Sequence, residues 1–103
     1  MLLIREVMHC KPGKARPLVE KFLAMGKLME REGMGKMRVM TDIAADRYWT
    51  VVSEFEVANL DAFEKMMSAP PGSEKAAKEF EAIMQGYHDL VEQGRREIFK
   101  IEG

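Results

Sequence analysis

Glu6 is the residue whose type and position most clearly suggest chemistry. It lies in the segment 2–10, where alternating polarity predicts a β-strand, on the face that otherwise carries apolar and sulfur-containing side chains. A carboxylate without a partner on such a face resists ionisation, and it could then act as a general base toward an acidic C–H or a phenol. The alternative is that Glu6 pairs with an Arg or Lys, or that it reaches water at the end of the strand.

Two histidines, His9 and His88, are the other side chains that could exchange a proton near neutral pH. His9 ends the first strand on the face opposite Glu6, and His88 follows Tyr87 near the end of a helical stretch. Each could shuttle a proton or bind a ligand, and each could equally lie at the surface without a role. Neither has a Cys, Asp or Glu at a spacing typical of metal ligands, so the sequence predicts no metal site and no cofactor.

A few further side chains could shape a pocket around such a base. Trp49 could form part of an apolar wall, with Ser53 and Tyr87 as polar groups that position a ligand. The alternative is that these residues, like the ten methionines, simply fill the core. The single cysteine, Cys10, has no second cysteine to pair with, and we expect an inert thiol.

The elements that must hold these residues follow one another in a simple order. Gly33, Asn59 and Ser73 are suitable helix caps, and Pro70-Pro71-Gly72 must interrupt the second helical stretch. The resulting βαββαβ order predicts an α+β, ferredoxin-like domain over residues 1–103, with an antiparallel four-stranded sheet and the helices on one face. Alternation predicts strands at residues 2–10, 35–43, 47–57 and 95–101, and helical spacing of apolar residues predicts helices within 14–32 and 59–90.

Composition narrows the possible partners. Sixteen basic and seventeen acidic residues are interleaved along the chain, so no basic patch for nucleic acid is expected. No apolar stretch is long enough to span a bilayer, and the chain reaches a charge at Arg5, which is untypical of a signal peptide. We therefore expect a cytoplasmic protein that binds neither membranes nor nucleic acids.

Three segments carry a resemblance to a known superfamily. They are Lys11-Pro12-Gly13-Lys14 after the first strand, the aromatic strand from Tyr48 to Glu56, and Asn59-Leu60-Asp61-Ala62-Phe63-Glu64 after it. Together they resemble the dimeric α/β-barrel superfamily, especially its antibiotic-biosynthesis-monooxygenase-like and NIPSNAP-like members. The resemblance implies a homodimer whose two sheets face each other, with ligands bound between sheet and helices or within the barrel. It also supplies a cover for the sheet face that the helices leave free.

The same resemblance separates the branches of the superfamily. Haem-degrading members carry an Asn on the first strand, a Trp in the helix after the third strand and an axial His soon after. Here Glu6 occupies the first position, Lys65 and Met66 stand near the second, and residues 76–80 contain no His. The resemblance therefore argues against haem degradation, while haem binding without degradation stays open.

The function that best fits these observations is the binding of a small hydrophobic or aromatic molecule. The resemblance implies a cofactor-independent monooxygenase or isomerase, with Glu6 as base, Ser53 and Tyr87 as positioning groups, and Trp49 shaping the pocket. The alternative is a non-catalytic ligand-binding or interaction protein of the same fold. An enclosed Glu6 beside Trp49 and Ser53 would favour catalysis, and an ion-paired, solvated Glu6 would favour binding alone.

Overall fold

Four antiparallel strands form one sheet in the computed structural model, which describes residues 1–68 and 73–103. The sheet has the order β2-β3-β1-β4, and every neighbouring pair is antiparallel. The ferredoxin-like prediction is confirmed, and β1, with apolar residues on both faces, is a central strand. The strands are β1 (Leu2–Cys10), β2 (Met37–Thr41), β3 (Thr50–Val57) and β4 (Val91–Lys100).

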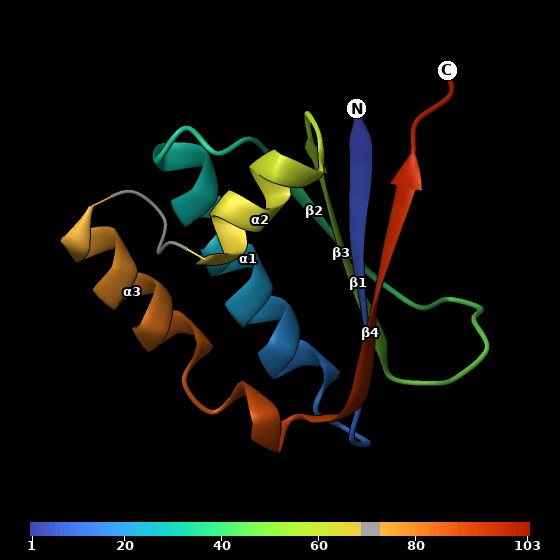
Figure 1. Cartoon of the computed structure of the whole chain (residues 1–103). Helices are drawn as coiled ribbons and strands as arrows, with labels where there is room; N and C mark the ends of the chain where they lie inside the picture. The colour runs from blue at the N-terminus through green and yellow to red at the C-terminus, as the bar shows by residue number, and fades with distance from the viewer. Residues whose placement is uncertain (69–72) are drawn as a thin grey trace.

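Three α-helices cover one face of this sheet, as Figure 1 shows. α1 (Ala15–Arg31) packs on β2 and β3, α2 (Leu60–Ser68) packs on β3, and α3 (Glu74–Met84) packs against α1. A short 3₁₀ turn, η1 (Tyr87–Asp89), leads into β4 and is its main helical neighbour. β4 therefore extends beyond the cover that the helices give to the other strands. None of the helices in the described residues is long and apolar enough to cross a membrane.

The predicted caps form as expected. Gly33 follows α1 with φ of +74°, a left-handed conformation that glycine adopts without the strain of a Cβ atom. The side chain of Asn59 accepts a hydrogen bond from the Ala62 N–H at 2.9 Å, and Ser73 accepts one from the Ala76 N–H at 3.2 Å. The predicted stop at Pro70-Pro71-Gly72 lies outside the described residues.

The strands on either side of residues 42–49 are shorter than predicted. Strands were expected over 35–43 and 47–57, but they run from Met37 to Thr41 and from Thr50 to Val57, joined by a loop. The Thr50 N–H donates to the Asp42 carboxylate at 2.9 Å, and the Thr50 hydroxyl donates to the Arg47 carbonyl at 2.8 Å. These local bonds compete with strand pairing and close the loop.

The last two elements also differ from the prediction. The helical stretch was expected to reach residue 90, but α3 ends at Met84 and Tyr87 begins η1 after Gly86. β4 starts at Val91, before the predicted start at residue 95. Alternation is absent from residues 91–94, where the short turn η1 is the main helical neighbour of the strand and only Val91 packs against the core.

The apolar core consists of two separate clusters of buried residues. The first lies between α1 and the sheet, and burial there raises the pKa of the Cys10 thiol, as expected for an unreactive cysteine. The second lies between α2 and the sheet. The first cluster is Cys10, Leu18, Val19, Phe22 and Val51, and the second is Ile4, Val57 and Phe63.

Candidate functional site

A row of polar side chains separates the two clusters on the helix-covered side of the sheet. Ser53, Glu6 and Arg96 lie directly opposite one another on β3, β1 and β4. Because side chains alternate along a strand, all three point to the face that carries Ile4 and Val51. On these three strands the sheet therefore presents a polar strip one residue wide, and Glu6 is at its centre.

Glu6 has a charged partner in this strip. Its carboxylate forms a short ion pair with the Arg96 guanidinium, and its side chain is 18% exposed. The Arg96 guanidinium also lies 5.1 Å from the centre of the Phe63 ring, at a distance suited to a cation–π contact. Arg96 is thus held between a carboxylate and an aromatic ring. The structure shows the ion-paired form of Glu6 that the sequence left as an alternative.

An open cleft of about 380 Å³ lies over Glu6 on the β4 side. It exists because the helices pack mainly on β2 and β3, while β4 is closed at one end by η1. Its apolar wall comes from Met8, Val91 and the ring of Tyr87, and His88 stands beside Tyr87 with the two rings 4.0 Å apart. A cleft of this size, with an apolar wall and a few charged groups, can hold a small organic molecule.

Gly94 shapes the floor of the same cleft. A Cβ atom added at Gly94 would overlap the sulfur of Met8, which lies opposite on β1. The missing side chain therefore lets Met8 lie flat across β4 instead of filling the cleft. Gly94 is therefore needed for the space that it leaves to Met8, and not for an unusual backbone conformation.

Replacing Gly94 by alanine should displace the flexible Met8 side chain into the cleft. We expect G94A to cost about 1 kcal/mol in free energy of unfolding, because the end of a methionine can move. We expect it to weaken binding of a naphthol probe by about 10-fold, because the cleft becomes narrower. Urea denaturation and calorimetric titration would measure both effects, with Glu64→Ala, an exposed change outside the cleft, as control. Unchanged probe binding in G94A would mean that the probe does not bind in this cleft.

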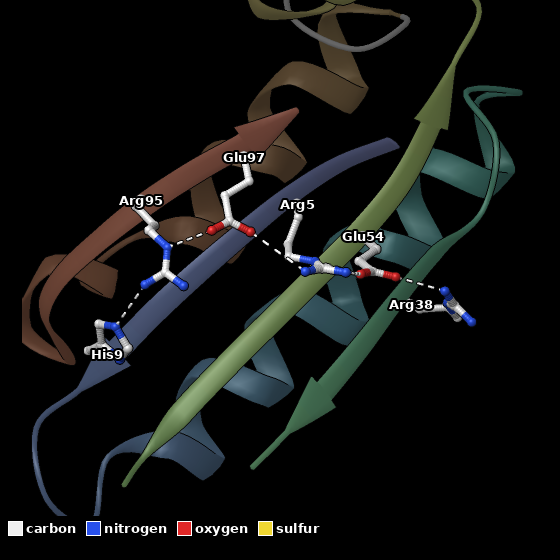
Figure 2. Close-up of polar contacts among 6 residues, drawn as sticks. All are labelled: Arg5, His9, Arg38, Glu54, Arg95 and Glu97. Carbon is white, nitrogen blue, oxygen red and sulfur yellow. Dashed lines mark hydrogen bonds and ion pairs between the residues drawn. The ribbon is translucent and has the colours of Figure 1, made fainter. Parts of the chain in front are cut away.

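None of the helices in the described part of the chain covers the other face of the sheet, which carries a row of alternating charges (Figure 2). Arg38, Glu54, Arg5 and Glu97 lie opposite one another on β2, β3, β1 and β4. Arg38 and Arg5 each donate to Glu54 at 2.7 Å, and Arg5 lies 3.6 Å from Glu97. Burial raises the pKa of the Glu54 carboxyl, but the hydrogen bonds from the two arginines outweigh burial and lower it overall.

His9 ends this network at the edge covered by the loop 42–49. The Thr50 hydroxyl donates its proton to the Arg47 carbonyl, so it accepts from His9 Nδ1 at 3.2 Å. Arg95 Nη1 lies 3.4 Å from His9 Nε2, and Arg95 Nε donates to Glu97 at 2.8 Å. His9 is only 3% exposed. Its two nitrogens are therefore committed to structural bonds on the face opposite the cleft.

Comparison with solved structures places this arrangement among known folds. A NIPSNAP family protein from Agrobacterium tumefaciens superposes with a TM-score of 0.74 at 13% identity, over 96% of this chain and 90% of that one. An antibiotic biosynthesis monooxygenase superposes with a TM-score of 0.70 at 11% identity over the whole of both chains. SnoaB, a cofactor-independent oxygenase from Streptomyces nogalater, gives 0.67 at 12% identity, over 99% and 93%.

The chain has the fold of the NIPSNAP-like and antibiotic-biosynthesis-monooxygenase-like proteins. This confirms the resemblance that the sequence indicated. No protein-family model matches the chain, and no curated protein matches it in sequence. At this level of identity the shared NIPSNAP-like fold says nothing about which reaction, if any, the cleft performs.

On this NIPSNAP-like fold, the predicted site residues do not all lie together. Glu6, Tyr87 and His88 line the cleft, and Ser53 adjoins Glu6 but is 1% exposed beneath the helices. His9 lies on the other face. Trp49 precedes β3 with φ of +59°, and its carbonyl accepts the Cys10 N–H at 2.8 Å. The left-handed backbone at Trp49 interrupts the alternation that the sequence prediction assumed.

The residues that the sequence analysis missed are Arg96 and Gly94. Arg96 lies within the predicted last strand, but only the pairing of β1 with β4 shows that it meets Glu6. A signal was present, since Glu6 needed a basic partner on the same face of a neighbouring strand. Gly94 lay before the predicted start of its strand. No group of three or more possible metal ligands occurs among the residues that the structure describes.

Proposed function

We propose that the protein binds a small hydrophobic or aromatic molecule in the cleft over β1 and β4 and acts on it without a cofactor, as a monooxygenase or isomerase. The observation that carries this proposal is a carboxylate, Glu6, at the floor of an open cleft whose wall is formed by Met8, Tyr87 and Val91. Such a cleft brings an acidic C–H or phenol next to a base while apolar side chains hold the rest of the molecule.

An ion-paired Glu6 is the arrangement that we expected of binding alone, so the catalytic proposal requires that Arg96 take part in the proton transfer. When Glu6 takes a proton from the bound molecule, its own charge is neutralised and a negative charge develops on the ligand. Arg96 pairs with Glu6 and lines the cleft, so its positive charge can stabilise the carboxylate before the proton transfer and the ligand anion after it. Phe63 keeps the guanidinium in place during this exchange. Tyr87 and His88 are at the mouth of the cleft and position the ligand.

The proposal includes a homodimer in the cytoplasm. The face of the sheet opposite the helices carries buried apolar residues among its charges, including Val7 at 4% exposure, and Phe99 and Met40 remain exposed there. A second copy of the sheet would cover them, as packed sheets do in other proteins. The interleaved charges of the chain support the absence of a nucleic-acid partner.

Turnover of phenols and naphthols under oxygen, with Glu6→Gln beside the wild type, tests the catalytic role of Glu6. We expect the variant to lose about 100-fold or more in kcat, because it cannot accept a proton, and to keep its affinity within about threefold. Glu92→Gln is the matched control, since Glu92 lines the same cleft but pairs with Arg47. Full turnover in Glu6→Gln would remove Glu6 from the mechanism.

The second candidate function is ligand binding without catalysis. The observation that favours it is the ion pair itself, because a carboxylate already satisfied by Arg96 needs no reaction to explain its position. In that case the wild type would bind the aromatic probes without converting them, and Glu6→Gln would change their affinity through Arg96. Detection of a converted product, with oxygen consumption as the added sign of an oxygenase, together with calorimetric titration separates the two functions.

A further inference from the structure

Lys21 joins α1 to the end of α3, at the point where the chain turns toward the cleft. Its ammonium group donates to the Ile83 carbonyl at 3.1 Å and to the Gln85 carbonyl at 2.7 Å. We propose that Lys21 is a positioning residue for the cleft, on which it acts through Gln85 and the turn η1. This inference rests on the ligand site proposed above and adds a residue that sets the shape of that site.

The end of α3 needs a donor of this kind. The last carbonyl groups of a helix have no partner within the helix, and they carry a partial negative charge that a cation stabilises. At the end of α1 the backbone meets this need, because the Met34 N–H donates to the Met29 carbonyl at 2.8 Å. The described residues of α3 include no basic side chain in the last turn, and Gln85 leaves the helical conformation with ψ of +128°. Lys21 supplies the positive charge from the neighbouring helix.

The segment 85–90, which leads from α3 through η1 into β4 (Figure 1), has little apolar surface to hold it. Within this segment only Tyr87 and Leu90 are half-buried, and the other residues are exposed. Polar bonds hold both ends, since Lys21 binds the Gln85 carbonyl and the Lys11 N–H donates to the Leu90 carbonyl at 2.9 Å. A segment with few buried contacts depends on such bonds for its position.

The position of this segment decides the shape of the cleft. Tyr87 and His88 line the cleft, and only Gly86 separates Tyr87 from the carbonyl that Lys21 binds. Loss of the Lys21 bonds would therefore shift the aromatic wall, whereas Glu6 would keep its place on β1 opposite Arg96. A displaced wall weakens ligand binding, while the proton transfer at Glu6 changes less.

Replacing Lys21 by methionine tests the role of the ammonium group, because methionine keeps an unbranched apolar chain without a donor. We expect K21M to weaken naphthol binding in calorimetric titration by about 10-fold. Under turnover, KM should rise by about the same factor, with kcat within about threefold of the wild type. K21R keeps donors for both carbonyls and should bind the naphthol within about threefold of the wild type.

Arg31→Met is the matched control for the packing of α3. Arg31 also joins α1 to α3, through its ion pair with Glu79 at 2.5 Å, but Glu79 lies more than one turn before the end of α3. We expect Arg31→Met to change naphthol affinity by less than about twofold, because the bonds at Gln85 remain.

Amide hydrogen exchange of the free protein reports on η1 without any ligand. The Asp89 N–H donates to the Gly86 carbonyl at 3.1 Å, and the Leu90 N–H donates to the Tyr87 carbonyl at 3.0 Å. We expect both amides to exchange about 10-fold faster in K21M than in the wild type, and to be little changed in Arg31→Met.

The outcomes separate the role of Lys21 from the proposed function. Unchanged exchange of the two amides in K21M, or naphthol binding as tight as in the wild type, would overturn the inference. Equal weakening in K21M and Arg31→Met would also overturn it, because the effect would then come from the packing of α3 as a whole. A wild type that binds no phenol or naphthol would overturn the proposed function, and faster exchange in K21M would still show that Lys21 holds η1.

Discussion

Replacing Phe22 by alanine is expected to lower the free energy of unfolding by about 4 kcal/mol. Phe22 is 2% exposed and belongs to the cluster that joins α1 to the sheet through Leu18 and Val51. Removing its ring leaves a cavity that this tightly packed helix cannot close, in addition to the lost burial of apolar surface. A domain of this size has about 5–15 kcal/mol in total, so the variant should be close to unfolding at 37 °C.

Urea denaturation followed by circular dichroism would measure this loss, with Leu23→Ala as the matched control. Leu23 is the next residue of α1 and is 44% exposed, so its truncation should cost less than about 1 kcal/mol. If both variants lost the same free energy of unfolding, the face of α1 that carries Phe22 would not be the one packed on the sheet.

Replacing Glu54 by glutamine is expected to cost about 2 kcal/mol at pH 7. Glu54 accepts hydrogen bonds from Arg5 and Arg38, and the neutral amide would deprive Arg38 of this carboxylate and leave Arg5 with Glu97 at 3.6 Å. The cost stays moderate because the Arg38 side chain is 76% exposed and can turn to water. Glu56→Gln, on the same face of β3, is the control, since Glu56 is exposed.

The pH dependence of stability gives this prediction a second readout. The pKa of Glu54 is lowered in the folded chain, so its contribution is present above the ordinary value of 4.5 and is lost as the pH falls through the folded pKa. The free energy of unfolding of the wild type should fall steeply below pH 4.5, and that of Glu54→Gln should fall less. Part of the pH dependence remains in Glu54→Gln, because the pKa of Glu97 is also lowered, by its hydrogen bond from Arg95. Parallel curves would contradict the role of Glu54, and measurement at two protein concentrations separates folding from association.

The alternation of single strands was enough to predict most of the architecture. Apolar residues on both faces of residues 2–10 indicated a central strand, and that is where β1 lies. The prediction failed where local polar bonds replace the ladder, at Asp42 and Thr50, and where the backbone turns left-handed, at Trp49. These features depend on side-chain geometry within one loop, which periodicity does not describe.

The candidate site was predictable only in part, for a different physical reason. Periodicity places Glu6 on the correct face, but it carries no information on which residue of another strand stands opposite. The partner Arg96 therefore emerges only from the register of β1 and β4. The charged row from Arg38 to Glu97 could not be predicted for the same reason. Its members are far apart in the sequence and become neighbours only through three strand pairings.

The polar strip of Ser53, Glu6 and Arg96 has a consequence for how this chain can change. Among the residues that the structure describes, the buried cluster around Phe63 and Ile4 has no member in common with the cluster beneath α1. The two halves still meet at the edge of the sheet, where Met37 of one stands opposite Phe55 of the other, so coupling between substitutions is expected mainly there. Met8, Tyr87 and Val91, which border the cleft, all pack against the α1 half. Ligand preference can therefore diverge mainly through the apolar wall on the α1 side, while Phe63 continues to hold Arg96 and to anchor α2.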